Sequence, residues 1–336
     1  MKKILIACAA LAVFVLGMGL TGCSKKSTGK SIAVFVPGII DDSPTYEKLA
    51  RGVTKAVEDF NQTASDDEKI NLFVMEAGTN QAEWGAKITA LAAEQKYDVI
   101  ISSNPSLPDL VEPITNQFPK QKFILLDATK EGNKNIYTVC YDQAQQGFLA
   151  GYIGGLMSKS GHLALIAAQE YPVMNEIIYP FFVKGAKAAL PAALVDFRVV
   201  GNWYDATKGA EIADAVIKNG ADVILPICGG AAQGVISSAV NKGVYISWFD
   251  DSGFSRAPGT IIGSSIVKQA DMAEIITSKF IAGNIDWGIA DMVGMQEGFI
   301  EFVENDPLYI STVPEDVRNK MSLLVKDITD GNFKIQ

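Results

Sequence analysis

The sequence predicts an α/β protein made of two doubly wound parallel-sheet lobes. Three observations lead to this fold class: short runs rich in Val, Ile and Phe, segments with helical spacing between them, and a second set of runs that repeats the first. After an N-terminal leader of 22 residues, 314 residues remain, which is enough for two domains of common size. The runs expected as strands are 31–37, 70–76, 97–103, 122–128 and 136–141, then 162–169, 195–203, 221–228, 244–250 and 259–266.

The segments between these runs carry apolar residues at helical spacing. In the first set, Tyr46, Leu49 and Val53 are spaced three and four residues apart. In the second set, Ile212 and Val216 are four residues apart. Strands that alternate with helices form parallel sheets through right-handed crossovers. Because the runs hold few polar residues, each sheet should be covered by helices on both faces.

The division into lobes follows from where the chain must cross between the two sets of strands. Residues 141–159 carry the chain from the first set to the second, and later crossings are expected near 263–268 and 290–295. The first lobe is therefore predicted to hold 31–141 plus about 267–292. The second is predicted to hold 142–266 plus about 293–336, with a helix over 313–328.

The first 22 residues have the layout of an export signal. Lys2 and Lys3 give a basic start, and residues 4–19 are an apolar run without an acidic residue. The signal ends in Leu20-Thr21-Gly22-Cys23, which predicts cleavage before Cys23 and lipid on its thiol. Residues 23–30 are then a lipidated polar tether that holds the protein to a bacterial membrane, facing the periplasm or the exterior.

Charge and cysteine content narrow the possible partners. Residues 1–22 hold two lysines and no acidic residue, so the mature chain has 27 basic and 38 acidic residues and a net charge of −11. This acidic balance argues against nucleic acid as a partner. Cys140 and Cys228 lie in apolar runs and are expected to be small buried residues rather than a disulfide or a metal pair.

Polar and aromatic side chains follow the predicted strands. Ligands of open parallel sheets bind beyond the carboxyl ends of the strands, so these positions are the candidate binding residues. They are Asp42, Ser43, Tyr46, Asn104 and Asp127 in the first lobe, and Tyr171, Trp203, Gly230 and Asp250 in the second.

Each of these candidates also has a purely structural interpretation. Ser43 is a predicted helix N-cap with Pro44 at the first helical position, so Ser43 and Asp42 could serve only to stabilise that helix. Asp127 could cap a loop, and Trp203 could be a packing aromatic.

The chemistry of these residues favours a nucleoside or a sugar over a nucleotide. Aromatic rings stack on planar heterocycles, and carboxylates accept hydrogen bonds from hydroxyl and amino groups but repel phosphates. Gly229 to Gly234 lacks the spacing of a dinucleotide fingerprint. His162 is the single histidine, so a Ser-His-Asp or Cys-His site would have to use this residue, and no histidine metal cluster exists. Neither an enzyme nor a cofactor or metal is predicted.

The chain resembles the basic-membrane-protein lipoproteins, and most closely the purine nucleoside receptors of spirochaetes. The segments that carry the resemblance cover most of the mature chain and are 33–38, 42–44, 92–95, 102–105, 171–174, 197–205, 226–230 and 247–251. Such proteins are the extracytoplasmic binding subunits of ABC-type nucleoside importers and have a type I periplasmic-binding fold with a hinge. The resemblance implies a purine nucleoside between the lobes, together with ABC permease and ATPase subunits as partners of a monomeric receptor.

The resemblance also implies roles for individual residues. Asp42, Asn104 and Asp127 would supply polar contacts from the first lobe, and Trp203 would stack on the base. Asp250 would accept hydrogen bonds from the ribose hydroxyls.

Two further positions take their roles from the resemblance alone. Gly230 would offer a backbone donor near the sugar. Lys268 would hold both the ribose and Asp250, or else be only a surface charge at the hinge.

One position departs from the family pattern. Where many relatives carry an asparagine after the first strand, this chain has Tyr46 in Ser43-Pro44-Thr45-Tyr46. Tyr46 could stack on the base or pack its helix against the sheet. A sugar or autoinducer-like ligand, a nucleoside-processing enzyme and a surface adhesin remain alternative functions.

Overall fold

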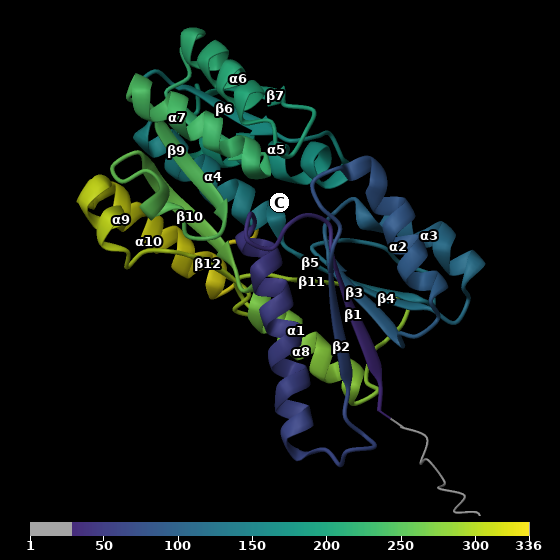
Figure 1. Ribbon diagram of the computed structural model, residues 1–336. Helices are drawn as coiled ribbons and strands as arrows, with labels where there is room; N and C mark the ends of the chain where they lie inside the picture. The colour runs from purple at the N-terminus through teal and green to yellow at the C-terminus, as the bar shows by residue number, and fades with distance from the viewer. Residues whose placement is uncertain (1–28, 336) are drawn as a thin grey trace, which may run out of the picture.

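The structure is a computed structural model that describes residues 29–335. It consists of two α/β lobes that lie side by side, each built around a six-stranded sheet (Figure 1). The predicted fold class is confirmed. The signal sequence and Cys23 lie outside the described residues, and no helix between residues 29 and 335 is long and apolar enough to cross a membrane.

The sheet of the first lobe has the strand order β11-β5-β4-β3-β1-β2, and all of its pairings are parallel. Its strands are β1 (Ser31–Val36), β2 (Asn71–Glu76), β3 (Val99–Ser103), β4 (Lys122–Leu126), β5 (Ile136–Tyr141) and β11 (Ala290–Val293). Its helices are α1 (Pro44–Thr63), α2 (Trp84–Ala93), α3 (Leu107–Gln117) and α8 (Gln269–Ile281), with a short 3-10 turn η1 (Gln81–Glu83).

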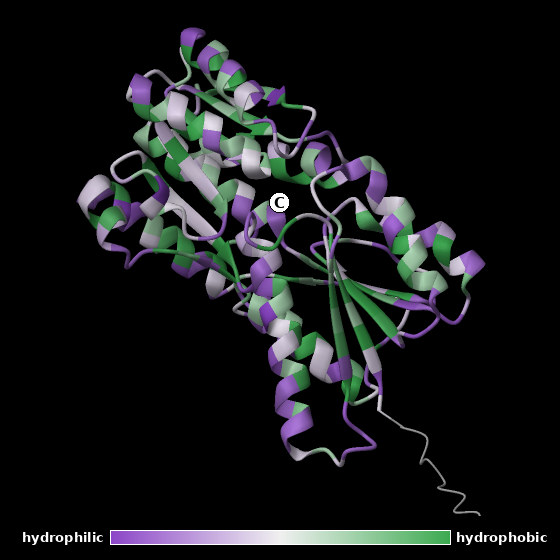
Figure 2. Cartoon of the chain, in the orientation of Figure 1, coloured by the Kyte–Doolittle hydropathy of each residue, from purple (hydrophilic) through white to green (hydrophobic). Residues whose placement is uncertain are grey.

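Alternation along the strands explains how this sheet is covered on both faces. On β1, Ile32 and Val34 belong to the core that includes α1 and α8, whereas Ala33 and Phe35 belong to the core under α2 and α3. Figure 1 shows α1 and α8 together on one side of the sheet and α2 and α3 on the other. The strands of the first lobe are hydrophobic along most of their length (Figure 2), as a sheet buried on both faces requires.

The sheet of the second lobe has the order β12-β10-β9-β8-β6-β7, in which only β12 is antiparallel to its neighbour. Its strands are β6 (His162–Ala167), β7 (Leu194–Val199), β8 (Val223–Ile227), β9 (Tyr245–Asp250), β10 (Ile261–Val267) and β12 (Ile300–Phe302). Its helices are α4 (Gln143–Met157), α5 (Tyr179–Ala189), α6 (Ala206–Lys218), α7 (Ala232–Lys242), α9 (Pro307–Thr312) and α10 (Glu315–Thr329). The one-turn segments η2 (Met174–Ile178), η3 (Gly229–Ala231) and η4 (Phe254–Arg256) complete it.

Glycines bring α4 and α5 into close contact. A Cβ atom at Gly151 would lie 2.0 Å from the carbonyl oxygen of Phe182, and one at Gly185 would lie 2.0 Å from that of Phe148. The helix pair can therefore pack backbone against backbone only because these positions lack side chains. The glycines of α4 therefore serve packing.

The chain passes between the lobes three times. It crosses from β5 to α4, from β10 to α8 and from β11 to β12, so that each lobe is built from discontinuous segments. The chain ahead of the first sheet is anchored earlier than expected. The N–H of Gly29 donates to the carbonyl of Asp67, and the ammonium of Lys30 donates to the carbonyls of Phe280 and Ile281. Residues 29 and 30 of the predicted tether thus contact the fold, and residues 23–28 lie outside the described residues.

Candidate functional site

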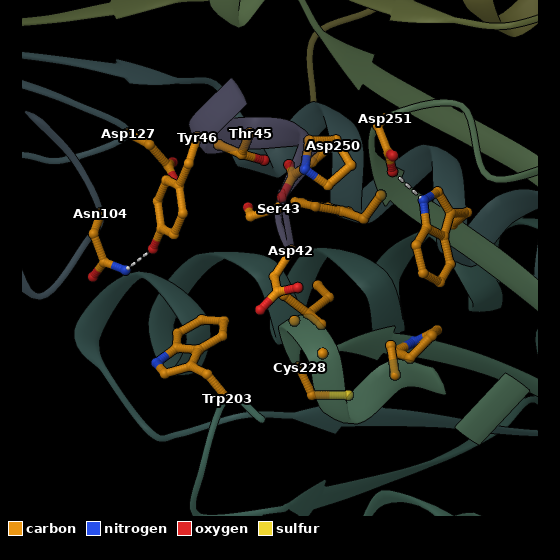
Figure 3. A pocket seen from close by; sticks show the side chains of 18 of the residues that line it. Asp42, Ser43, Thr45, Tyr46, Asn104, Asp127, Trp203, Cys228, Asp250 and Asp251 are labelled. Atoms are coloured by element: carbon orange, nitrogen blue, oxygen red, sulfur yellow. Dashed lines mark hydrogen bonds between the residues drawn. The ribbon is translucent and has the colours of Figure 1, made fainter. Parts of the chain in front are cut away.

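A cavity lies between the two lobes at the carboxyl ends of their strands (Figure 3). Its volume is about 180 Å³. Nine of the ten strand-end and hinge candidates line it: Asp42, Ser43, Tyr46, Asn104, Asp127, Tyr171, Trp203, Gly230 and Asp250. Both lobes contribute, so a ligand in this cavity would touch both.

Two aspartates hold equivalent places in the two lobes. Asp127 follows β4 directly and Asp250 is the last residue of β9. Both have left-handed backbones, with φ of 52° and 68°. This region is unfavourable for most L-residues but is tolerated by aspartate, and it turns each chain sharply at the strand end. Residues held in such conformations cluster at functional sites.

Burial raises the pKa values of both carboxyl groups. Removal from bulk water is the main cause for Asp250, and the neighbouring Asp251 adds to it, so that the pKa of Asp250 rises to about 7. A hydrogen bond from Gln146 opposes the rise. The pKa of Asp127 is raised well above its ordinary value, first by burial and then by the charge of Asp250. The cavity therefore disfavours two negative charges at once.

Tyr46 and Asn104 form a buried pair on the first-lobe side. The Nδ2 of Asn104 donates to the Oη of Tyr46 over 3.1 Å, and the Oδ1 of Asn104 accepts from the backbone N–H of Ser106 over 2.9 Å. Burial is the main cause of the raised pKa of Tyr46. Since its Oη accepts from Asn104, the hydroxyl proton of Tyr46 is left to donate elsewhere.

The second lobe contributes an aromatic wall. Trp203 and Tyr204 lie in the turn before α6, whose first N–H groups are capped by Asp205. The rings of Tyr171 and Trp203 are tilted against each other with centroids 6.4 Å apart. The Nε1 of Trp203 is buried and has no hydrogen-bond partner. Gly230 lies beside them: a Cβ atom built on this glycine would be 3.5 Å from the Tyr204 ring.

The loop before α1 forms the edge of the cavity. Asp42 is exposed and Ser43 is half-buried, and Figure 3 shows both between the two lobes' side chains. Ser43 occupies the N-cap position with Pro44 first in the helix, as predicted, but its hydroxyl makes no capping hydrogen bond. The carbonyl of Ser43 accepts instead from the N–H groups of Tyr46 and Glu47.

The lobes touch across the mouth of the cavity. A Cβ atom on Gly38 of the first lobe would lie 2.8 Å from the Oη of Tyr204 in the second, and 2.8 Å from the Tyr46 ring. Gln169 of the second lobe donates to Gln81 of the first over 2.9 Å. The two lobes are therefore in direct contact at both places.

Several cavity residues were not among the sequence candidates. Trp248 donates through Nε1 to Asp251, which also accepts from Arg256 over 3.0 Å. The Arg256 guanidinium lies 5.1 Å from the centroid of the Trp248 ring. Gln143, the first residue of α4, donates to Asp127 over 2.6 Å. It follows the end of β5 by two residues, so the strand-end rule could have found it.

Lys268 does not reach this cavity. Its ammonium lies 3.5 Å from a carboxylate oxygen of Glu301 on β12, and it lines a separate surface hollow with Ile300 and Glu304. The predicted contact between Lys268 and Asp250 is therefore absent from the structure. Lys268 follows the end of β10 where β10 pairs with the antiparallel edge strand β12, and its ammonium lies beside Glu301 of that strand.

Three other residues considered in the sequence lie in defined structural surroundings. His162 opens β6 and lies beside Asp196 and the carbonyl of Asn219, remote from the cavity lining. Cys140 and Cys228 are both free and buried, and Cys228 forms part of the cavity wall.

The charge of the cavity is acidic. The residues that line it include four carboxylates, Asp42, Asp127, Asp250 and Asp251, and a single cation, Arg256, which is already paired. Within residues 29–335 no group of three or more His, Cys, Asp or Glu side chains is arranged to hold a metal ion. The cavity thus disfavours an anionic ligand, and it offers acceptors and aromatic rings to a ligand that brings hydrogen-bond donors and a flat face.

Two α/β lobes, three crossings and a polar cavity between the strand ends define a type I periplasmic-binding fold. Solved structures agree on the fold. An ABC transporter solute-binding protein from Aeropyrum pernix K1 superposes with a TM-score of 0.73 at 16% identity, covering 91% of this chain and 92% of that one. The glucose-galactose binding protein GanP from Geobacillus stearothermophilus gives a TM-score of 0.62 at 16% identity, covering 83% and 99%.

Residues 29–329 match the family Bmp, described as ABC transporter substrate-binding protein PnrA-like, and the chain belongs to this family. Basic membrane protein A of Borreliella burgdorferi is 24% identical, with 97% of this chain and 94% of that protein covered. A CD4+ T-cell-stimulating antigen of Listeria monocytogenes is 22% identical, with 100% and 99% covered. The protein is accordingly an extracytoplasmic substrate-binding protein of an ABC transporter, with a small-molecule ligand and transporter partners, and not an enzyme.

Proposed function

We propose that this protein captures purine nucleosides, such as inosine, guanosine and adenosine, between its lobes and delivers them to an ABC permease and its ATPase. The observation that carries the proposal is the composition of the cavity. Aromatic rings enter it from both lobes, Tyr46 from one and Trp203 from the other, and buried aspartates end a strand of each sheet. A base between rings gains about 1 to 3 kcal/mol per stack.

The aspartates account for the sugar half of such a ligand. Asp127 and Asp250 face the cavity without an ion-pair partner among residues 29–335. A ribose supplies hydroxyl donors that satisfy buried carboxylates, and hydrogen bonds to charged groups contribute about 1.5 to 3 kcal/mol each. A phosphate in the same place would meet four carboxylates and one paired arginine. The proposal is therefore a nucleoside rather than a nucleotide.

A sugar is the second candidate ligand. GanP, a neighbour by fold, is a glucose-galactose binding protein, and sugars also stack on tryptophan. The purine reading is favoured because the aromatic groups are spread over both lobes, with Tyr46, Tyr171, Trp203 and Tyr204 all lining the cavity. A single monosaccharide fills less of such a surface than a base joined to a ribose.

Attachment to the membrane through lipid on Cys23 is part of the proposal. Gly29 and Lys30 are held by the first lobe, which leaves Ser24 to Thr28 as a short polar link from the lipid to the fold. Such a link would keep a monomeric receptor at a high local concentration beside its transporter. Mass spectrometry of the membrane-extracted protein, compared with Cys23→Ser, tests this: the variant should be released from membranes.

Ligand-driven closure is the mechanism that the two-lobed geometry supports. A ligand that contacts Trp203 and Asp250 in one lobe and Tyr46 and Asp127 in the other binds the closed arrangement best, and so shifts the hinge equilibrium toward it. The closed form, with Tyr204 against Gly38, is the form that a permease could distinguish from the open one.

The test is a thermal-unfolding and calorimetric panel on residues 24–336 freed of endogenous ligand. At 100 times its dissociation constant a true ligand stabilises the fold by about 2.7 kcal/mol. Inosine, guanosine and adenosine should do so, whereas ribose and galactose should not. Stabilisation by the sugars alone would show that the purine assignment is wrong.

Two variants and one control separate the roles of base and sugar. Trp203→Ala should weaken the binding of nucleosides and of free purine bases alike. Asp250→Ala should weaken the binding of nucleosides much more than that of free bases. Trp287→Ala removes a tryptophan that packs on Phe280 away from the cavity, and should leave affinities unchanged. Unaltered affinity in both cavity variants would refute the residue assignments.

A further inference from the structure

The helix that begins at the first hinge crossing carries glutamines at the inner end of the cavity. Gln143 is the first residue of α4, directly after the chain leaves the first lobe at Tyr141, and it lines the cavity. Its side chain is 93% buried, since only 7% of its surface is exposed. Gln146, one turn later, is fully buried and hydrogen-bonds Asp250 and the carbonyl of Ser265.

Gln143 uses only half of its amide within the protein. Its Nε2 donates to Asp127 across the hinge over 2.6 Å. The Oε1 of Gln143 is then buried with no hydrogen-bond partner. A buried acceptor without a donor is unfavourable, and such groups are uncommon in folded proteins.

The surroundings of this oxygen are rich in acceptors and poor in donors. Asp127 and Asp250 are acceptors, and the Oε1 of Gln146 is also buried and unpartnered. Among residues 29–335, no lysine or arginine pairs with either aspartate. Among residues 29–335 no donor lies within hydrogen-bond distance of the Oε1 of Gln143, so we expect the ligand to supply the donor that satisfies it.

We propose that Gln143 is a ligand-contacting specificity residue, whose Oε1 accepts a hydrogen bond from one sugar hydroxyl of the bound nucleoside. This inference rests on the proposed nucleoside function and adds the selection of ribose over deoxyribose. A nucleoside without that hydroxyl leaves the buried oxygen unpaired on closure. Sites built to hydrogen-bond a hydroxyl reject analogues that lack it far more strongly than apolar pockets reject a missing methylene.

The experiment compares each nucleoside with its deoxy derivatives by calorimetry. The tightest binder among adenosine, inosine and guanosine is titrated beside its 2′-deoxy, 3′-deoxy and 5′-deoxy forms. At least one deoxy form should bind the wild-type protein about tenfold or more weakly, as expected for an unpaired buried acceptor. In Gln143→Met, which keeps the size of the side chain but has no acceptor or donor, that ratio should fall to within about threefold of one.

Two further variants distinguish contact from mere support of Asp127. Gln143→Glu keeps an acceptor at this position but loses the donor to Asp127, so it should bind more weakly overall while retaining the preference for the hydroxyl. Gln145→Met, on the same helix, removes an oxygen that accepts from the N–H of Met295 outside the cavity, and should leave the ratio unchanged.

The outcomes separate the two claims. If nucleosides bind but Gln143→Met weakens the parent and all deoxy forms equally, Gln143 only supports the hinge and the inference is overturned. If no nucleoside binds the wild-type protein, the proposed function fails and the inference fails with it.

Discussion

Replacing Asp250 by asparagine should stabilise the ligand-free protein at alkaline pH. The pKa of Asp250 rises from 3.8 to about 7 in the folded protein, mainly because of burial. At about 1.4 kcal/mol per pH unit, this difference corresponds to at most about 4 kcal/mol of stability. Water inside the cavity and opening of the lobes reduce this penalty, so we expect a gain of about 2 kcal/mol for the variant at pH 8.

The direction of the pH dependence follows from the raised pKa. A carboxyl group that binds its proton more tightly when folded contributes stability below its unfolded pKa of about 3.9, and this contribution is lost as the pH rises through about 7. The advantage of Asp250→Asn should therefore be complete above pH 7 and disappear as the pH falls toward 4.

Denaturant unfolding from pH 4 to pH 9 measures this difference directly. Asp42→Asn, at the exposed edge of the same cavity, is the matched control and should change stability little at any pH. If Asp250→Asn is no more stable than the wild type at pH 8, or if its advantage grows as the pH falls, the reasoning about the buried aspartate is wrong. Asp250→Asn should also bind nucleosides more weakly, because a residue that is placed for binding often lowers the stability of the folded protein.

Three further predictions concern closure, the hinge surface and the first-lobe pair. A Cβ atom at Gly38 would lie 2.8 Å from both the Oη of Tyr204 and the Tyr46 ring, so Gly38→Val should hold the lobes apart. We expect ligand affinity to fall by about tenfold or more, and the radius of gyration measured by scattering with ligand present to be larger than that of the wild type. Lys268→Met should leave ligand affinity within about twofold, because Lys268 pairs with Glu301 and lies outside the cavity; a large loss of affinity would restore the predicted contact with Asp250. Tyr46→Phe leaves the Nδ2 of Asn104 without its acceptor, so it should lower the free energy of unfolding by about 1 to 3 kcal/mol, measured by denaturant unfolding. An unchanged denaturation midpoint would show that this hydrogen bond contributes nothing.

Much of the fold could be predicted because the strands are short apolar runs buried on both faces. All ten expected runs overlap an observed strand, and β1 shows why: residues 32–36 are buried without exception, so the sequence there has no polar interruption. β11 and β12 were not among the expected strands. β11 has four residues, none of them buried, and β12 has three residues with one exposed position, so neither leaves an apolar run of ordinary strand length.

The candidate site could be predicted to the extent that the strand-end rule applies. Asp127, Trp203 and Asp250 stand at or just after strand ends and face one cavity because parallel strands bring their carboxyl ends to one edge. Lys268 satisfies the same rule, yet it turns outward to Glu301, because the direction of a side chain beyond a strand depends on the next element.

Gln143 shows how far the strand-end rule reaches. It follows the end of β5 by two residues, so the rule could have placed it near the cavity, but its hydrogen bond to Asp127 depends on how the hinge joins the two lobes. For Tyr46 the sequence left both stacking on a ligand and packing in the lobe open. In the structure Tyr46 is buried in the hydrophobic core and also lines the cavity.

The most direct test of the central claim is a calorimetric titration of ligand-free protein with inosine and with inosine 5′-monophosphate. An uncharged nucleoside held between aromatic rings and buried aspartates should bind one to one, and the nucleotide should bind at least about a hundredfold more weakly because its phosphate meets the acidic cavity. Equal binding of the two, or binding of neither, would contradict the account.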